Sequence, residues 1–279
     1  MVRSLFALLL FVPALLQAQT GLLVVAHGAD SGWNARVLET VAQVKWKGPV
    51  ATAFLMGSQA TTQGWSAGVD SLLAHGARRL VVVPLMVSTY GGHVRQIQYY
   101  AGARDSLPAS LMGHDHGSHE PVQVPVTVTS ALDDAPELRA ALEARWRELD
   151  AADRKRPILL VAHGPNDPVD AGHWLADLGT ASRQLGVSAQ TDARVMLLRD
   201  DAPADVRAAA VAAMRDTVMA LSRRASDSVV VMPVMISSGT ITKVKIPRDL
   251  AGLPIRYHPR PLAPLPMLAR WVERVAGGG

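Results

Sequence analysis

Two histidines follow apolar runs that end in the same three residues. The run LLVVAHGAD (22–30) contains His27, and the run ILLVAHGPND (158–167) contains His163. Because ligands of open parallel sheets bind beyond the carboxyl ends of the strands, both positions favour function. A neutral imidazole accepts a proton near neutral pH and binds divalent transition metals. The alternative is that each histidine only caps its strand through a backbone hydrogen bond, and the repetition favours a functional role.

A third histidine follows another apolar run. The run RLVVVPLM (79–86) leads into a short polar loop, then Gly91, Gly92 and His93. We expect His27 and His93, 66 positions apart, to face each other across one cleft. The paired glycines leave the backbone open to a flat or bulky ligand. A flexible entry into a helix is the alternative interpretation of this segment.

The second half of the chain departs from the first at this position. When its Pro-containing strand is aligned with the first, Thr242 stands at the place of His93, so a symmetrical second site is not expected. Arg95 and Lys243, with Lys245 and Arg248, are candidates to neutralise the carboxylates of an anionic ligand. Solvation of a helix surface is an equally good explanation for these basic side chains.

A histidine-rich segment, MGHDHGSHEP (112–121), holds His114, His116 and His119 beside two acidic residues. This spacing lets several imidazoles reach one ion from a loop, and Co²⁺, Ni²⁺ or Zn²⁺ would suit such ligands. The segment lacks the fixed four-ligand pattern of a structural zinc site, so we expect weak, exchangeable binding. A disordered polar insertion is the alternative.

Apolar runs alternate with helical patterns along the whole chain. Continuous Val/Leu runs without polar alternation are typical of parallel strands buried on both faces, which indicates an α/β fold. Strands are expected at 22–26, 50–56, 79–86, 122–128, 157–162, 193–198, 228–235 and within 253–259. Helices are expected at 32–45, 62–75, after His93, at 135–149, 171–185 and 203–224, and in a last segment ending near 275.

The two halves repeat the same order of elements. We therefore expect two similar modules, 21–150 and 151–279, each a parallel sheet flanked by helices, with a cleft between them. The charged stretch DAADRKRP (150–157) is the expected linker. The alternative is that α/β sequences resemble one another by composition alone.

The first 20 residues have the pattern of a secretory signal peptide, with an early positive charge, an apolar run and small or polar residues near Ala18. We expect cleavage between Ala18 and Thr20 and an exported protein, periplasmic or secreted, without a membrane span. An uncleaved anchor is the alternative, although the apolar run is shorter than the roughly 20 residues that a spanning helix needs. The chain has no cysteine, which excludes disulfides. Its 28 basic and 24 acidic residues are scattered, which argues against nucleic acid as a partner.

The run LLVVAHGAD, followed by GGHV behind a VVVPLMVS strand, resembles the class II tetrapyrrole chelatases, the sirohydrochlorin cobalto- and ferrochelatases of the CbiX type. The longer members of that family are tandem copies of one α/β module. The resemblance implies that His27 and His93 are catalytic, holding the incoming metal and taking part in removal of the pyrrole protons. It also implies a tetrapyrrole partner and a divalent metal as substrate, Co²⁺, Fe²⁺ or Ni²⁺, with no organic cofactor.

The other candidate residues would have supporting roles in such a site. The residues expected to bind the ring are Gly91, Gly92, Arg95, His163 and Lys243, and the histidine-rich segment would supply further metal ligands. An exported carrier of metal or tetrapyrrole, without turnover, is the alternative function. A hydrolase with a histidine nucleophile is a weaker candidate, because no arginine follows His-Gly closely enough to bind a phosphate.

Overall fold

The computed structural model describes residues 19–108, 111 and 121–278 and contains two parallel sheets of four strands. The first sheet has the order β2-β1-β3-β4, and the second has the matching order β6-β5-β7-β8. The strands of the first sheet are β1 (Gln19–Ala26), β2 (Val50–Phe54), β3 (Ala77–Pro84) and β4 (Val126–Val128). Those of the second are β5 (Ile158–Ala162), β6 (Ala193–Leu197), β7 (Val229–Val234) and β8 (Ile255–Tyr257).

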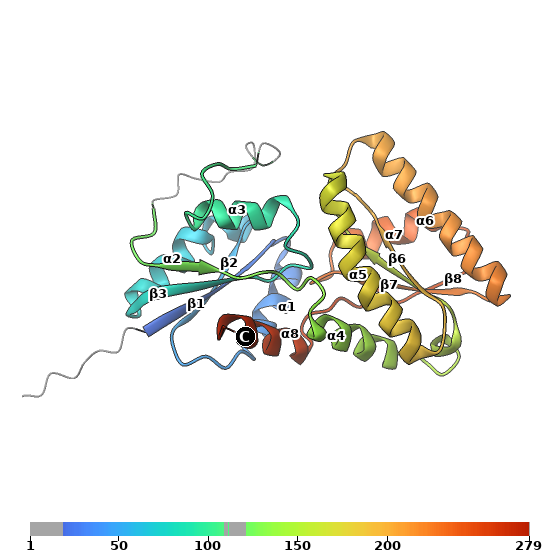
Figure 1. Cartoon of the computed structure of the whole chain (residues 1–279), viewed down its shortest axis with the longest axis horizontal. Helices are drawn as coiled ribbons and strands as arrows, with labels where there is room; N and C mark the ends of the chain where they lie inside the picture. The colour runs from blue at the N-terminus through green and yellow to red at the C-terminus, as the bar shows by residue number, and fades with distance from the viewer. Residues whose placement is uncertain (1–18, 109–110, 112–120, 279) are drawn as a thin grey trace, which may run out of the picture.

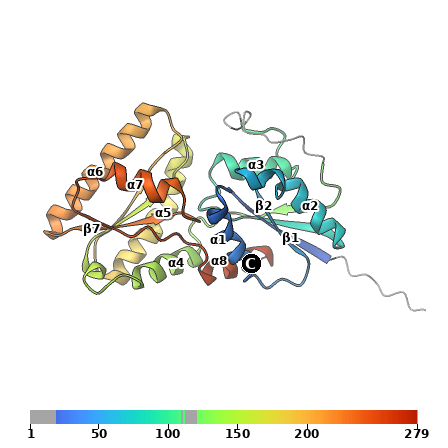
Figure 2. The same cartoon turned by 180° about the vertical axis from the view of Figure 1, so that it is seen from behind.

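Helices cover both sheets (Figures 1 and 2). They are α1 (Ser31–Val41), α2 (Trp65–Ala74), α3 (Gly92–Tyr100), α4 (Pro136–Arg147), α5 (Pro168–Ala189), α6 (Ala204–Ala225), α7 (Ile246–Asp249) and α8 (Pro266–Ala276). Shorter helical turns are η1 (Ser58–Thr61), η3 (Asp153–Lys155) and η4 (Ile241–Lys245). The two-module α/β fold predicted from the sequence is confirmed, since both halves have the same strand order and all strands pair in parallel.

The central strands are buried because helices cover both of their faces. Every residue from Leu22 to Ala26 in β1 and from Ile158 to Ala162 in β5 has no exposed surface. Each of these strands therefore needs apolar side chains at successive positions rather than at alternate ones. This is the physical origin of the two repeated apolar runs.

Several elements differ in their bounds from the sequence-based expectation, and two of them, β4 and α3, differ for a physical reason. The strand expected at 122–128 is reduced to β4, because Pro125 has no N–H to donate and contributes only its carbonyl, which accepts from the Leu80 N–H at 2.9 Å. Helix α3 begins at Gly92, so His93 lies in its first turn rather than before it. The imidazole is thus fixed by a helix instead of a loop.

The modules exchange a helix at their carboxyl ends. Helix α4, which follows the first sheet in the chain, packs against α5 of the second module. Helix α8, the last of the described helices, packs against β3 and α1 of the first module, and the two exchanged helices contact each other (Figures 1 and 2). The sequence boundary expected near residue 150 falls between α4 and η3, and the packing extends across it.

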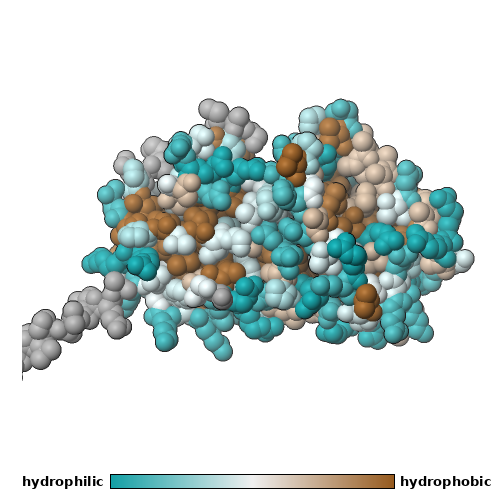
Figure 3. Space-filling model, in the orientation of Figure 1, coloured by the Kyte–Doolittle hydropathy of each residue, from teal (hydrophilic) through white to brown (hydrophobic). Residues whose placement is uncertain are grey.

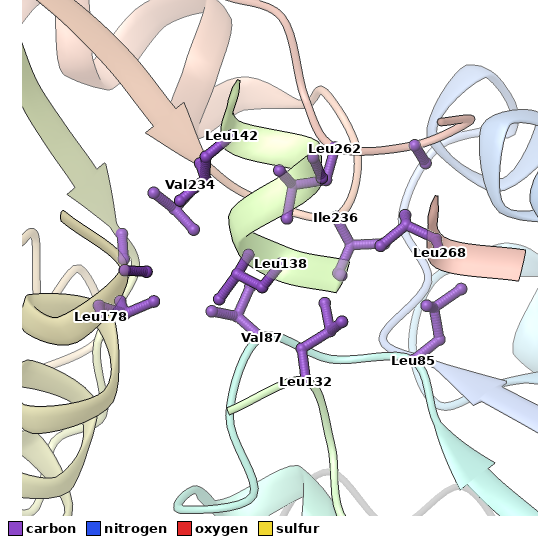
Figure 4. Packing of buried hydrophobic residues seen from close by; sticks show 14 of the residues in the cluster. Leu85, Val87, Leu132, Leu138, Leu142, Leu178, Val234, Ile236, Leu262 and Leu268 are labelled. Atoms are coloured by element: carbon purple, nitrogen blue, oxygen red, sulfur yellow. The ribbon is translucent and has the colours of Figure 1, made fainter. Parts of the chain in front are cut away.

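One apolar core continues through both modules (Figure 4). It joins Leu85 and Val87 after β3, Leu138 and Leu142 of α4, and residues of the second module that include Leu178, Val234, Ile236 and Leu262. Shared burial of this kind opposes separation of the modules, because separation would expose the apolar surface of the exchanged helices to water. None of the described helices has the length and hydropathy of a membrane-crossing segment.

Candidate active site

His27 lies immediately after β1, in a loop whose geometry depends on a glycine. Gly28 has a φ of +83°, and a Cβ atom there would lie 2.4 Å from the Met56 carbonyl oxygen. The Met56 N–H donates to the His27 carbonyl at 2.7 Å, which joins this loop to the end of β2. Asn34, fully buried in α1, accepts from the Ala29 N–H at 3.0 Å. Backbone and helix therefore fix the position of the His27 ring.

His93 is positioned by α3 and by the loop before it. In that loop the Thr89 N–H and the Thr89 hydroxyl donate to the carboxylate of Asp133, which follows β4, at 2.6 Å and 2.7 Å. Within α3, the His93 ring is 3.0 Å from the amide oxygen of Gln96, and the Gln96 amide N–H₂ donates to the Tyr100 hydroxyl at 2.7 Å. Gln96 is 1% exposed. The buried side-chain amide of Gln96 therefore fixes the orientation of the His93 imidazole.

The two rings meet at the carboxyl edge of the first sheet. Their centroids are 4.7 Å apart and their planes are nearly perpendicular, at 87°. His27 Nδ1 is 2.7 Å from the Gly28 carbonyl oxygen, and a carbonyl can only accept, so Nδ1 carries the hydrogen. In His93 the same reasoning applies to Nδ1 and the Gln96 oxygen. In the neutral form each ring therefore has its lone pair on Nε2, the atom that binds a metal ion or accepts a proton.

The surroundings keep His27 uncharged. Its side chain remains accessible to solvent, yet the protein atoms around it exclude enough water to lower the pKa to about 4. Desolvation is the largest cause, and the neighbouring His93 adds to it; the hydrogen bond to the Gly28 carbonyl opposes both. His27 is therefore neutral, and competent as a metal ligand, throughout the physiological pH range.

The second module presents His163 at the equivalent position after β5. Its Nδ1 is 2.8 Å from the Gly164 carbonyl oxygen, and Gly164 has a φ of +75°, as in the first module. His163 and Asp201 both act electrostatically on His27, with opposite signs. Thr242, at the place of His93, is 1% exposed and bonds to the Gly239 backbone. The two modules therefore offer different side chains at matching positions.

Trp33 of α1 contacts residues at the carboxyl edges of both sheets. Its ring centroid is 6.4 Å from that of His27, and its carbonyl accepts from the Ser237 hydroxyl at 3.0 Å. Ser237 belongs to the loop after β7 in the second module, so the carboxyl edges of both sheets come together beside His27. The outline of the molecule dips between the modules beside α3 and α5 (Figure 3).

The predicted ring-binding residues have varied surroundings. A Cβ atom built on Gly91 would have nothing within 4 Å, so the backbone there is open. Gly92 opens α3. Arg95 forms a bidentate pair with Asp170 of α5, with both N–O distances 2.6 Å, and any substrate carboxylate has to compete with it. Lys243 is exposed on η4.

Other histidines of the chain serve different contacts. His173 stacks on Tyr90 with the ring centroids 3.9 Å apart, and Trp174 donates its indole N–H to the Tyr90 carbonyl, which joins α5 to the loop before His93. His258 lies 2.8 Å from Asp153. The histidine-rich segment, with His114, His116 and His119, lies outside the described residues, so its metal-binding role stays a prediction. A cavity of about 350 Å³ between β2 and α2 is lined by Thr52, Gln63 and neighbouring residues and includes none of the site histidines.

Three site residues were not predicted from the sequence. Gln96 and Trp33 look like ordinary helix residues, although Gln96 follows His93 by three positions and so shares its helix face. Asp201 lies just beyond the carboxyl end of β6, where the rule that selected the histidines also applies.

The comparisons with known proteins give a family model for the first module and solved structures with the same fold. Residues 21–149 match the family model CbiX, whereas a search of curated protein sequences finds no match. The sirohydrochlorin chelatase SirB from Bacillus subtilis subspecies spizizenii, solved in complex with cobalt, has a TM-score of 0.62 at 12% identity, covering 93% of this chain and 94% of that one. SirB from Bacillus subtilis with Fe³⁺ has a TM-score of 0.61 at 14% identity with the same coverage.

A third solved structure is DR2241 from Deinococcus radiodurans, a multi-domain protein described as structurally similar to chelatases. Its TM-score is 0.56 at 19% identity, and the match covers 93% of this chain and 55% of that one. At these identities the structural likenesses establish the fold. The family match assigns the N-terminal module, residues 21–149, to the CbiX family.

Proposed function

We propose that this protein is a metal chelatase that inserts Co²⁺ or Fe²⁺ into a sirohydrochlorin-type tetrapyrrole. The observation that carries the proposal is the meeting of His27 and His93, with ring centroids 4.7 Å apart, at the carboxyl edge of the module that matches CbiX. The name of SirB, a sirohydrochlorin chelatase, supports the choice of ring.

The chemistry requires a site that binds the ion and then releases it. A hydrated divalent ion has to lose water, be held by a few ligands, and pass to four ring nitrogens while two N–H protons leave the ring. Imidazole binds such borderline ions with intermediate strength, and so permits the transfer. A carboxylate-rich or thiolate-rich cage would hold the ion more firmly than the reaction allows.

The two histidines differ in their suitability for the two tasks. His27, with a pKa of about 4, stays deprotonated at neutral pH and is a poor proton acceptor, so we assign it to holding the metal. His93, with its Nδ1–H directed at Gln96, presents Nε2 as a second ligand and, once the ion has left that atom for the ring, as the acceptor for a pyrrole proton. The protons then pass to solvent, since His27 and its surroundings remain accessible.

The ring requires an open backbone and cationic partners. Gly91 provides the open backbone beside His93, and exposed Lys243 provides a cation on the facing module for the acetate and propionate groups of the ring. Arg95 would contribute only after giving up part of its pairing with Asp170. We further propose that the protein acts outside the cytoplasm, on the basis of the signal-peptide pattern of residues 1–20.

An anaerobic absorbance assay tests the proposal. The purified protein is mixed with Co²⁺ and a fivefold excess of sirohydrochlorin, and the spectrum of the metallated ring is followed against a reaction without protein. Metallation of several rings per protein molecule supports a chelatase. Binding of metal or ring in a fixed ratio to protein, with the rate of metallation unchanged, contradicts catalysis and supports the carrier. Repeating the assay with Fe²⁺ and Ni²⁺ ranks the metals.

A further inference from the structure

His163 and Asp201 bring two acceptor atoms face to face in the second module. The Nδ1–H of His163 donates to the Gly164 carbonyl at 2.8 Å, so the neutral ring has its lone pair on Nε2. That atom lies 3.4 Å from a carboxylate oxygen of Asp201. Two lone pairs at this distance repel each other, and a hydrogen-bond donor or a metal ion between them relieves the repulsion.

The loop that carries Asp201 is fixed to the loop that carries His163. Arg199, at a φ of +50°, donates its N–H to the His163 carbonyl at 2.6 Å, and its guanidinium donates to the carbonyls of Pro165 and Asn166. Asn166 in turn donates to the Asp201 carbonyl at 2.9 Å. The spacing of the two side chains is therefore set by the backbone of both loops.

The negative charge of the neighbouring Asp200 is already neutralised by two basic side chains. One of its oxygens accepts from Arg207 at 3.3 Å, and the other pairs with Lys245. Asp201, by contrast, makes no ion pair with an arginine or lysine among the residues that the structure describes, and its side chain is 71% exposed against 32% for His163. One oxygen of Asp200 nevertheless lies within 4.8 Å of the ligand atoms of the other two. Asp201 is therefore the carboxylate beside His163 that has no basic partner among the described residues.

The pair lies close enough to the first module for both of its residues to act electrostatically on His27. His163 follows β5 as His27 follows β1, and the loop after β7 bonds to Trp33, the neighbour of His27. One imidazole and one carboxylate suit the same borderline divalent ions as two imidazoles. Only two or three protein ligands leave the remaining positions to water, so the ion can leave again.

We infer that His163 and Asp201 form a docking site for a divalent metal ion on the second module, from which the ion passes to His27 and His93. The site itself depends only on geometry and ligand chemistry. The transfer rests on the proposed chelatase function, and the two parts are tested separately.

The first test uses Co²⁺ alone, with no ring. Its background is the full chain in which the other candidate ligands, His27, His93, His114, His116 and His119, are replaced by Ala, and binding is measured by calorimetry and visible absorbance at pH 7.5. We expect one equivalent of Co²⁺ to remain, and we expect His163→Gln or Asp201→Asn in this background to raise the Kd at least tenfold. Absence of the remaining equivalent, or a Kd unchanged by both substitutions, overturns the site.

Matched controls separate ligation from folding. His75→Gln and Asp70→Asn change exposed residues of the α2 region and should leave the Kd unchanged; circular dichroism verifies the fold of each variant. In the otherwise unaltered chain, Asp201→Asn should raise the KM for Co²⁺ several-fold, with a smaller effect on the KM for the ring. An unchanged KM overturns the transfer role, whereas absence of turnover in the unaltered protein contradicts the proposed function and leaves the metal-binding result standing.

Discussion

The rings of His27 and His93 lie edge to face, 4.7 Å apart between centroids, although one follows β1 and the other begins α3. Parallel pairing of β1 with β3 brings the carboxyl ends of both strands to one edge of the sheet. The glycine turn after His27 and the buried amide below His93 then fix each ring independently. Catalysis of metal insertion would depend on this convergence.

The proximity of His93 contributes to the low pKa of His27. We expect histidine resonances in NMR spectra to report a His27 pKa near 4 in the unaltered protein and a value closer to 6.5 in His93→Ala, because the substitution removes a neighbouring charge and admits water. A His27 pKa that stays near 4 after loss of His93 would mean that the remaining protein atoms alone set it.

This depressed pKa also affects stability in acid. The unfolded chain takes up a proton at His27 near pH 6.5, whereas the folded protein resists it down to about pH 4. Above pH 6.5 the contribution of His27 to the free energy of unfolding therefore does not depend on pH. As the pH falls from 6.5 to 4, protonation of His27 in the unfolded chain increasingly destabilises the folded protein. In urea titrations the loss of stability across this window should be smaller for His27→Gln than for the unaltered protein.

Gln96 is a positioning residue for His93. Gln96→Leu replaces a buried amide that contacts both His93 and Tyr100, and should cost about 1–3 kcal/mol of stability. We expect its kcat to fall at least tenfold with little change in the KM for the ring, because the imidazole loses its orientation. Gln96→Glu can still accept from His93 and should retain more activity than the leucine variant. Equal kcat values for all three proteins contradict the positioning role.

The Arg95–Asp170 pair should contribute more to stability than the less buried pair between Arg274 and Glu137. Asp170 is 6% exposed, so removing the arginine leaves a carboxylate that water hydrates poorly. We expect Arg95→Ala to lower the free energy of unfolding by about 2–3 kcal/mol. The matched control is Arg274→Ala, which breaks a bidentate pair with Glu137 in which the side chains are 42% and 16% exposed, and should cost less, about 1 kcal/mol. Equal losses in thermal or urea unfolding contradict this ranking.

Export and processing give a further prediction. Strand β1 begins at Gln19 and pairs there with Ala77, so cleavage immediately after Ala18 would keep the whole strand. We expect the intact mass of the protein recovered from the periplasm or medium to correspond to a chain starting at Gln19. A full-length mass in the membrane fraction indicates an uncleaved anchor.

Much of the fold follows from local pattern. Buried strands such as β1 and β5 need apolar side chains at every position, and this marks them in the sequence. The meeting of His27 and His93 follows from the same pattern, because parallel strands align their carboxyl ends. Asp201 could have been selected by the same rule, since it lies just past β6.

Other features depend on packing that no local pattern records. The apolar face of α8 fits a core helix of either module, and only the three-dimensional arrangement places it on β3 and α1. The engagement of Arg95 by Asp170 is equally invisible in the sequence, because the partners are 75 positions apart on different modules. The sequence therefore shows that Arg95 is a cation, but it does not show that Arg95 already forms an ion pair with Asp170.

The most direct test of the paired-histidine account is the initial rate of Co²⁺ insertion into sirohydrochlorin by three variants. His27→Ala and His93→Ala should each lower kcat by about 10²–10⁴, the range expected when a residue that transfers protons or binds the reacting ion is removed. His75→Ala, an exposed histidine in the same module, should keep the unaltered rate. Retention of more than half of the rate by either of the first two variants, in correctly folded protein, contradicts the account.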